Sequence, residues 1–185
     1  MCSKARSRIG LLFRGFVSRD KPTMVKAYKV YVRPILEYCS VVWSPWQVGL
    51  INALENVQRY FTRRLIWPTV MSYSERLALL DLELLEIRRI KADLTMCFKI
   101  LHNLTCLDAN KYFTYDCREL CVRDYDENRL LCIATVTNRG ENNFFNRTVK
   151  FWNSLSRELR STSSLAVFKE LLNSHDFCHF LKGHV

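Results

Sequence analysis

The acidic residues are the first side chains to consider for metal-assisted catalysis. Polymerases and nucleases hold two Mg²⁺ ions a few ångströms apart, which requires clustered carboxylates. The eighteen acidic residues of this 185-residue chain are scattered, and no two aspartates are adjacent. The densest group, Asp124-Tyr125-Asp126-Glu127, lies in a polar stretch and is more typical of a solvated turn. The sequence therefore predicts no catalytic magnesium centre.

Cysteine and histidine residues form two groups whose spacing is weakly similar to that of zinc ligands. Their members are Cys106, Cys117, Cys121 and Cys132 in the first group and His175, Cys178, His179 and His184 in the second. Neither group has the two short paired spacings that are typical of a tetrahedral zinc site. We favour the alternative, ordinary thiols and exposed histidines, and predict no metal site.

Motifs for covalent catalysis and for phosphate binding by a loop are also missing. The chain has no Gly-x-Ser-x-Gly sequence, and no pairing of a cysteine with a histidine stands out. Its five glycines are isolated, so no glycine-rich loop can surround a phosphate group. We therefore expect that the chain is not an enzyme on its own.

Positive charge is concentrated in the first third of the chain. Residues 1–64 contain twelve Lys and Arg against three acidic residues, whereas the remainder contains sixteen against fifteen. Nearly all of the formal net charge of +10 thus lies in this part. The bias favours a polyanionic partner, and the alternative is that the cations only keep a helical face soluble.

Some of these cations recur at the spacing of a helix turn. Lys26, Lys29 and Arg33 fall on one face, and Arg59 and Arg63 are one turn apart on another. Long cationic side chains at this spacing can contact successive phosphates of a nucleic acid without reading its sequence.

Apolar residues at three- and four-residue steps predict the helices that would position these cations. The inward residues of the first stripe are Val25, Tyr28, Val32, Ile35, Cys39 and Val42. Pro22 suits the first turn of this helix, and Pro34 should kink or restart it. The inward residues of the next helix are Val48, Ile51, Leu54, Val57, Phe61 and Leu65, and Pro68 ends it.

The sequence Trp43-Ser44-Pro45-Trp46 lies between these two helices. Ser44 is a candidate N-cap and Pro45 a first-turn residue of the second helix. We therefore predict a helix corner in which both tryptophans are packed, rather than an aromatic platform for nucleobases.

Later parts of the chain are less regular. Ser72 and Glu75 predict a capping box for a short helix through Leu80, and a long helix is predicted over 83–102. The apolar, β-branched run 130–137 predicts a short strand or hairpin, after which two C-terminal helices are expected. We predict a mainly α fold with three segments, a basic helical bundle (1–104), an irregular connecting segment (105–142) and a C-terminal helical segment (143–185).

The eight cysteines could form disulfides or stay reduced, and the lack of a signal peptide and of a membrane span favours an intracellular protein. The apolar run 9–13 is interrupted by Arg14 and is too short for a signal peptide. No stretch reaches the roughly 18 to 20 apolar residues of a membrane span, so no membrane partner is expected. The eight cysteines are then expected to be reduced and mostly buried.

Four blocks in a fixed order cover roughly residues 20–173. They are KAYKVYVRPILEYCSVVWSPW, LENVQRYFTRRL, SYSERLALLDLELLEIRRIKADLTMCFKILHN and NNFFNRTVKFWNSLSRELRSTSSLAVFKELL. Together they resemble the region downstream of the catalytic domain in non-LTR (LINE-type, jockey-like) retrotransposon reverse transcriptases. The ordered combination is specific, whereas any single block would be weak.

The resemblance implies a thumb-like helical bundle of an RNA-directed DNA polymerase that grips the template–primer duplex. The implied partners are an RNA–DNA or DNA duplex, bound by the basic N-terminal third, and the palm of a related polymerase. If expressed, the protein would act in the nucleus or cytoplasm within a ribonucleoprotein. The residues assigned to phosphates, from their helix faces, are Lys26, Lys29, Arg33, Arg59, Arg63 and Arg64.

The sequence also departs from the family pattern. The aromatic-x-Asp-Asp motif and the other Mg²⁺-binding aspartates of the palm lie upstream in the family, so Mg²⁺ would belong to a missing palm. Met1 falls inside what resembles the start of the thumb, which predicts a truncated reading frame. The family block Trp-Asn-x-Leu-Pro ends here at Ser156 instead of proline, so that the helix can run on. The alternative function is a degenerate relic or a helical interaction module with no independent activity.

Overall fold

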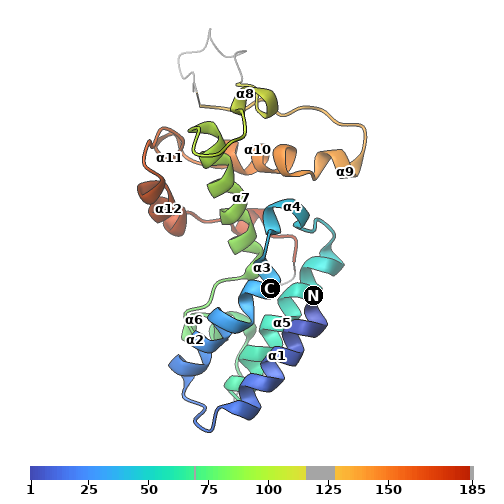
Figure 1. Cartoon of the computed structure of the whole chain (residues 1–185), viewed down its shortest axis with the longest axis vertical. Helices are drawn as coiled ribbons and strands as arrows, with labels where there is room; N and C mark the ends of the chain where they lie inside the picture. Colours follow the sequence, from blue (N-terminus) through green and yellow to red (C-terminus); the bar gives the residue numbers. More distant parts are fainter. Residues whose placement is uncertain (69, 116–127, 184–185) are drawn as a thin grey trace. The chain divides into compact units, whose positions relative to one another are not determined.

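The computed structural model describes residues 1–68, 70–115 and 128–183, and these are mainly helical (Figure 1). The predicted mainly α fold is therefore confirmed. By its packing the chain divides into two compact units. Unit 1 comprises Met1–Arg89 and Phe180–Val185, and unit 2 comprises Ile90–His179.

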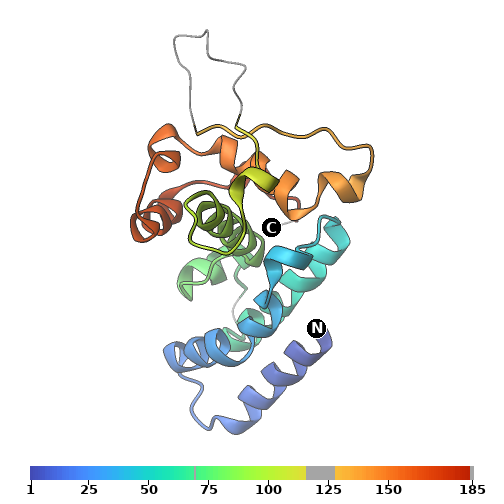
Figure 2. The same ribbon diagram turned by 45° about the horizontal axis from the view of Figure 1, so that its top comes forward.

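Unit 1 is a bundle of helices. Its helices are α1 (Cys2–Gly15), α2 (Lys21–Tyr31), α3 (Arg33–Glu37), α4 (Ser40–Trp43), α5 (Val48–Leu65), α6 (Tyr73–Leu79) and the first turn of α7 (Leu85–Leu101). Helix α1 packs against α2, α3 and α5, and α5 also packs against α6 (Figure 2). The apolar stripes predicted from the sequence supply part of this core, in which Val25, Tyr28, Val32, Leu54, Val57 and Phe61 are buried.

Local sequence signals explain where several of these helices begin. The Asp20 carboxylate accepts a hydrogen bond from the Thr23 amide, and Pro22 occupies the first turn of α2. Pro34 restarts the chain as α3, as predicted. Ser72 and Glu75 form the predicted capping box of α6.

The apolar core of unit 1 centres on Phe61 of α5. Its ring stacks on Tyr28 of α2 with centroids 4.4 Å apart, and Phe13 of α1 lies 6.0 Å away on another side. All three side chains are buried. Aromatic contacts at these distances add to the gain from burying the ring area, so one residue ties three helices together.

A buried polar network lies beside this core. The Tyr28 hydroxyl donates to Gln58 Oε1 at 3.0 Å, and Gln58 Nε2 donates to the Tyr73 hydroxyl at 3.1 Å. The Tyr73 hydroxyl donates in turn to the Glu55 carboxylate, which also accepts from the Leu85 amide at 3.1 Å. Because buried polar groups are costly unless bonded, this chain of bonds fixes α2, α5, α6 and α7 in one arrangement.

The end of the chain returns to unit 1. The amides of Lys182 and Gly183 donate to the two carboxylate oxygens of Glu86, each at 3.0 Å. A Cβ atom on Gly183 would lie 3.0 Å from Glu86 Oε2 and 3.1 Å from the Ile51 side chain, so a larger residue would crowd this contact. The tail is thus part of the unit 1 fold.

Unit 2 is organised around the rest of α7. Its helices are α8 (Ala109–Tyr112), α9 (Asn138–Glu141), α10 (Phe144–Ser154), α11 (Arg157–Arg160) and α12 (Leu165–Ser174). Asp93 of α7 is buried and accepts two hydrogen bonds from the Arg147 guanidinium of α10, at 2.8 and 3.0 Å. Phe98 of α7 stacks on Phe168 of α12, with centroids 4.4 Å apart. One helix, α7, therefore supplies residues to both units.

The predicted strand over 130–137 is wrong. Within the described residues, strand-like pairing is limited to one antiparallel bridge between Tyr115 and Leu130. The Asn153 side chain takes the place of a partner strand, because its amide accepts from the Leu130 amide and donates to the Leu130 carbonyl. Ile133 and Val136 are exposed, since no described segment covers them. A β-branched run forms a strand only where neighbours pair with it and bury it.

The expectation that α10 can run on past Leu155 is also wrong. Leu155 is extended (φ −67°, ψ 151°), and the Ser156 hydroxyl accepts from the Leu159 amide to begin α11. A serine N-cap therefore ends one helix and starts the next where the family pattern has proline.

Most of the described cysteines are not buried, contrary to the prediction. Cys97 is buried and Cys2 is half-buried, whereas Cys39, Cys106, Cys132 and Cys178 are exposed and all six are free thiols. Cys39 is in the left-handed region (φ 52°), which interrupts the predicted apolar stripe and leaves Val42 exposed as well.

No helix in the described ranges has both the length and the apolar character of a bilayer span.

Replacing Glu55 with Gln tests the buried network through its pH dependence. Burial raises the pKa of Glu55, although the hydrogen bond from Tyr73 opposes that shift. The folded protein therefore binds the proton of the Glu55 carboxyl group more tightly than the unfolded chain does. This contribution to stability is present at low pH and is lost as the pH rises through the raised pKa. We expect the unfolding free energy of Glu55→Gln to increase relative to that of the wild type as the pH rises above about 4, the ordinary pKa range of a glutamate.

Denaturant titrations at a series of pH values measure this difference. Glu75→Gln is a control of opposite sign, because hydrogen bonds from Ser72 lower the pKa of Glu75 and its contribution is lost as the pH falls. A difference between Glu55→Gln and wild type that stays constant with pH would contradict the assignment.

Candidate nucleic-acid interface

The six cations predicted to contact phosphates all lie in unit 1, in three different settings. Lys26 and Lys29 line one pocket, and Arg63 and Arg64 line another. Arg33 and Arg59 are half-buried and contact other side chains of the unit. The structure thus divides the predicted set into two pairs that line pockets and two arginines that contact other side chains of the unit.

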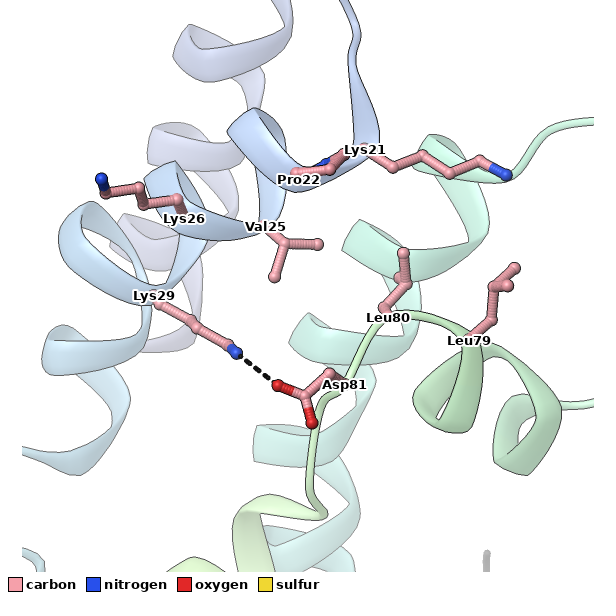
Figure 3. A pocket seen from close by; sticks show the side chains of 8 residues that line it. All are labelled: Lys21, Pro22, Val25, Lys26, Lys29, Leu79, Leu80 and Asp81. Carbon is pink, nitrogen blue, oxygen red and sulfur yellow. Dashed lines mark hydrogen bonds and ion pairs between the residues drawn. The ribbon is translucent and has the colours of Figure 1, made fainter.

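The first pocket, here called the lysine pocket, lies between α2 and the end of α6 (Figure 3). It has a volume of about 430 Å³ and is lined by Lys21, Pro22, Val25, Lys26, Lys29, Leu79, Leu80 and Asp81. Lys29 reaches across to Asp81 at 3.3 Å, while Lys21 and Lys26 extend in other directions. Because the Asp81 side chain is fully exposed, this ion pair is weak and a phosphate could compete for Lys29.

The second pocket, here called the arginine pocket, lies at the C-terminal end of α5. It has a volume of about 610 Å³ and is lined by Arg19, Tyr60, Arg63, Arg64, Leu65 and Trp67. The Arg64 guanidinium lies 4.5 Å from the centroid of the buried Phe13 ring and donates to the Tyr60 hydroxyl at 3.1 Å. Arg19 lies 5.9 Å from the same ring. These contacts orient two guanidinium groups before any ligand arrives.

The electrostatics of the arginine pocket favour an anion. Its lining includes three guanidinium groups and no carboxylate. Within the described part of the chain, no ion pair engages Arg19, Arg63 or Arg64. Tyr60 and Trp67 add exposed aromatic faces, with 42% and 73% of their surface accessible. The pocket therefore combines unneutralised cations with ring surfaces that are open to a ligand.

Arg33 belongs to a charge cluster inside unit 1. Its Nε atom lies 3.5 Å from Glu37, and Arg88 donates two hydrogen bonds to the same carboxylate. Burial, together with the like charge of Arg88, lowers the pKa of Arg33. An arginine remains protonated even so, and its charge here is directed to Glu37.

Arg59 is likewise engaged within the protein. Its guanidinium lies 4.9 Å from the Tyr73 ring centroid, and Nη1 donates to the Asn56 side chain at 3.4 Å. Substituting Arg33 or Arg59 would therefore disturb packing as well as charge. Phosphate contact by Arg33 and Arg59 stays a prediction. Variants of these two residues would change the packing of unit 1 together with its charge.

The sequence prediction missed two cations and two aromatic residues that line the pockets, namely Arg19, Lys21, Tyr60 and Trp67. A signal for two of them was present, because Tyr60, Arg63, Arg64 and Trp67 follow the i, i+3, i+4, i+7 pattern of one helix face. Arg19 and Lys21 flank the N-cap of α2, where no periodic pattern exists to reveal them.

The candidate metal ligands do not gather into a site within the described ranges, where no three His, Cys, Asp or Glu side chains lie together. The His175 ring packs edge-on against Phe177 at 4.7 Å, and the Cys178 amide donates to Asp176. Cys117, Cys121 and the group Asp124-Tyr125-Asp126-Glu127 lie outside the described residues.

The helix corner before α5 differs in part from its prediction. Helix α5 begins at Val48, so Ser44 is not its N-cap. Trp43 is half-buried against the core, and its indole N–H donates to the Tyr38 carbonyl at 2.6 Å. Trp46, by contrast, is 39% exposed. The packed hinge therefore consists of Trp43, and Trp46 lies outside it.

Comparison of the chain with protein-family models, curated proteins and solved structures finds no match. What the two pockets bind is therefore inferred from their chemistry and from the ordered blocks of the sequence.

Trp43→Ala tests whether this residue supports the fold or contacts a ligand. Removing a packed tryptophan costs about 3 to 5 kcal/mol when it is fully buried, so we expect about 2 to 4 kcal/mol at this half-buried position. Affinity for a nucleic-acid duplex should change less than about twofold where the variant is folded. Denaturant unfolding and fluorescence anisotropy measure the two quantities, with the exposed Trp46→Ala as the matched control. Loss of duplex binding at unchanged stability would show that Trp43 contacts the ligand.

Proposed function

We propose that unit 1 binds the phosphate backbone of a nucleic acid through the lysine pocket and the arginine pocket. The observation that supports this most directly is the gathering of six cationic side chains around two pockets whose linings contain a single carboxylate, Asp81. The six are Arg19, Lys21, Lys26, Lys29, Arg63 and Arg64. A polyanion with regularly spaced charges suits such a surface.

The proposed binding is independent of sequence. Lysine ammonium groups act as point charges toward phosphates, and arginine guanidinium groups can bond two phosphate oxygens at once. The contacts of the two pockets do not indicate an element that would enter a groove of the nucleic acid and read its base edges. Affinity would come from release of counterions and would fall with salt.

The ordered sequence blocks support a more specific proposal. The chain would be the thumb-like, C-terminal part of a non-LTR retrotransposon reverse transcriptase, and the duplex would be an RNA–DNA or DNA template–primer. The catalytic aspartates and their Mg²⁺ would belong to a palm that this sequence lacks. In that case unit 1 would grip nucleic acid without catalysing its synthesis, within an intracellular ribonucleoprotein.

Salt-dependent binding tests the proposal. For wild type, the logarithm of the association constant for a 20-base-pair RNA–DNA duplex should fall with the logarithm of salt concentration, with a slope of about 0.9 for each phosphate neutralised. Lys26→Gln and Arg63→Gln should each reduce that slope by about 1 and weaken binding to all duplex sequences alike. Fluorescence anisotropy between about 50 and 300 mM salt measures both effects.

Lys169→Gln provides the matched control, because Lys169 is an exposed cation of α12 in unit 2. Its slope should equal that of wild type. Binding without salt dependence, or slopes unaffected by Lys26→Gln and Arg63→Gln, would contradict phosphate contact at the pockets.

A second function is favoured by a different observation. Five large apolar side chains between residues 38 and 50 are exposed, namely Tyr38, Val42, Trp46, Val48 and Leu50. Grouped exposed apolar residues are typical of protein interaction sites. By this reading the chain is a helical interaction module whose partner is the missing palm, with no independent activity. It would then bind a hydrophobic dye, Val42→Ser with Leu50→Ser would reduce that signal, and duplex binding would be absent.

A further inference from the structure

We propose that the arginine pocket holds an unpaired nucleotide of the bound strand, with its base against Trp67 and Tyr60 and its phosphate on the arginines. This proposal rests on the proposed function, because it specifies which part of a nucleic acid one of the two pockets takes. The two pockets then have different ligands: the arginine pocket binds an unpaired nucleotide, and the lysine pocket binds backbone phosphate.

The two pockets differ in what they offer besides charge. The lysine pocket presents the aliphatic side chains of Pro22, Val25, Leu79 and Leu80, which have no ring face for a base. The arginine pocket presents Trp67 and Tyr60, both exposed. Sites for single strands typically combine a cationic surface with aromatic rings on which bases stack.

The geometry of the arginine pocket favours one nucleotide over a stretch of duplex. A volume of about 610 Å³ lies within the roughly 300 to 1,000 Å³ of sites that surround a small molecule. Within a duplex both faces of a base are covered by its neighbours, so the base has no face left for Trp67. An unpaired base has a free face, and aromatic side chains recognise it there.

The phosphate side of the pocket is arranged in advance. The buried Phe13 ring lies under the guanidinium groups of Arg64 and Arg19, and the Tyr60 hydroxyl accepts from Arg64. Phe13 is fixed in turn by Phe61 of α5. A guanidinium held in this way loses less freedom when it binds an anion, which improves affinity.

Two RNA–DNA duplexes of equal paired length provide the test, one blunt and one with a five-nucleotide single-stranded extension. Stacking of one base on an aromatic side chain contributes about 5- to 100-fold in affinity. We expect wild type to bind the extended duplex at least 5-fold more tightly than the blunt one. Trp67→Ala should lower the ratio of the two affinities to about 1, whereas Trp67→Phe should retain most of the preference.

Trp46→Ala is the matched control, since it removes another exposed tryptophan of unit 1 that does not line the pocket. Its preference should equal that of wild type. Quenching of tryptophan fluorescence by the single-stranded extension alone should occur in wild type and decrease in Trp67→Phe, which gives a second readout that does not depend on Trp67→Ala.

The outcomes separate this inference from the function on which it rests. Equal wild-type affinity for the two duplexes, or a preference that survives Trp67→Ala, would overturn the nucleotide site while leaving phosphate binding in place. Absence of binding to both duplexes would overturn the two proposals together.

Discussion

The contacts of Phe61 are the interaction on which the rest of unit 1 depends. Its ring joins Tyr28 of α2 to Phe13 of α1, and Phe13 in turn supports the guanidinium groups of Arg64 and Arg19. The helix that carries the lysine pocket and the residues that form the arginine pocket are therefore connected through a single line of aromatic rings. Because aromatic rings pack in preferred geometries, these contacts also fix surface side chains that lie outside the core.

The buried polar network constrains the same helices in a different way. Glu55, Gln58 and Tyr73 leave little freedom to the junction of α5 and α6, because any shift would break hydrogen bonds that water cannot replace. That junction precedes Leu80 and Asp81, which close one side of the lysine pocket. Apolar contacts thus hold the helices of unit 1 together. A few hydrogen-bonded polar groups then select one arrangement of these helices over similar ones.

Much of the helical architecture could be predicted from the sequence because its signals are local. Pro22, Pro34 and the Ser72–Glu75 capping box act within one turn of the chain and determine helix ends directly. One error arose where a distant residue decided the outcome, because Asn153 satisfies Leu130 in place of a neighbouring strand. Another arose from a local backbone conformation that apolar periodicity does not reveal, because the left-handed Cys39 redirects the stripe that should have buried Val42. At the candidate site the cations on helix faces were identified, whereas Arg19 and Lys21 came into the pockets only through tertiary packing.

The contact of Lys182 and Gly183 with Glu86 has a consequence for how unit 1 folds. Unit 2 occupies about ninety residues between the two parts of unit 1, so it has the topology of an insertion. Closing so long a loop has an entropic cost that rises slowly with length, and folding of unit 2 lowers this cost by shortening the flexible path. The bonds from Lys182 and Gly183 to Glu86 span 96 and 97 residues of sequence. Unit 1 is therefore completed only when this long loop is closed.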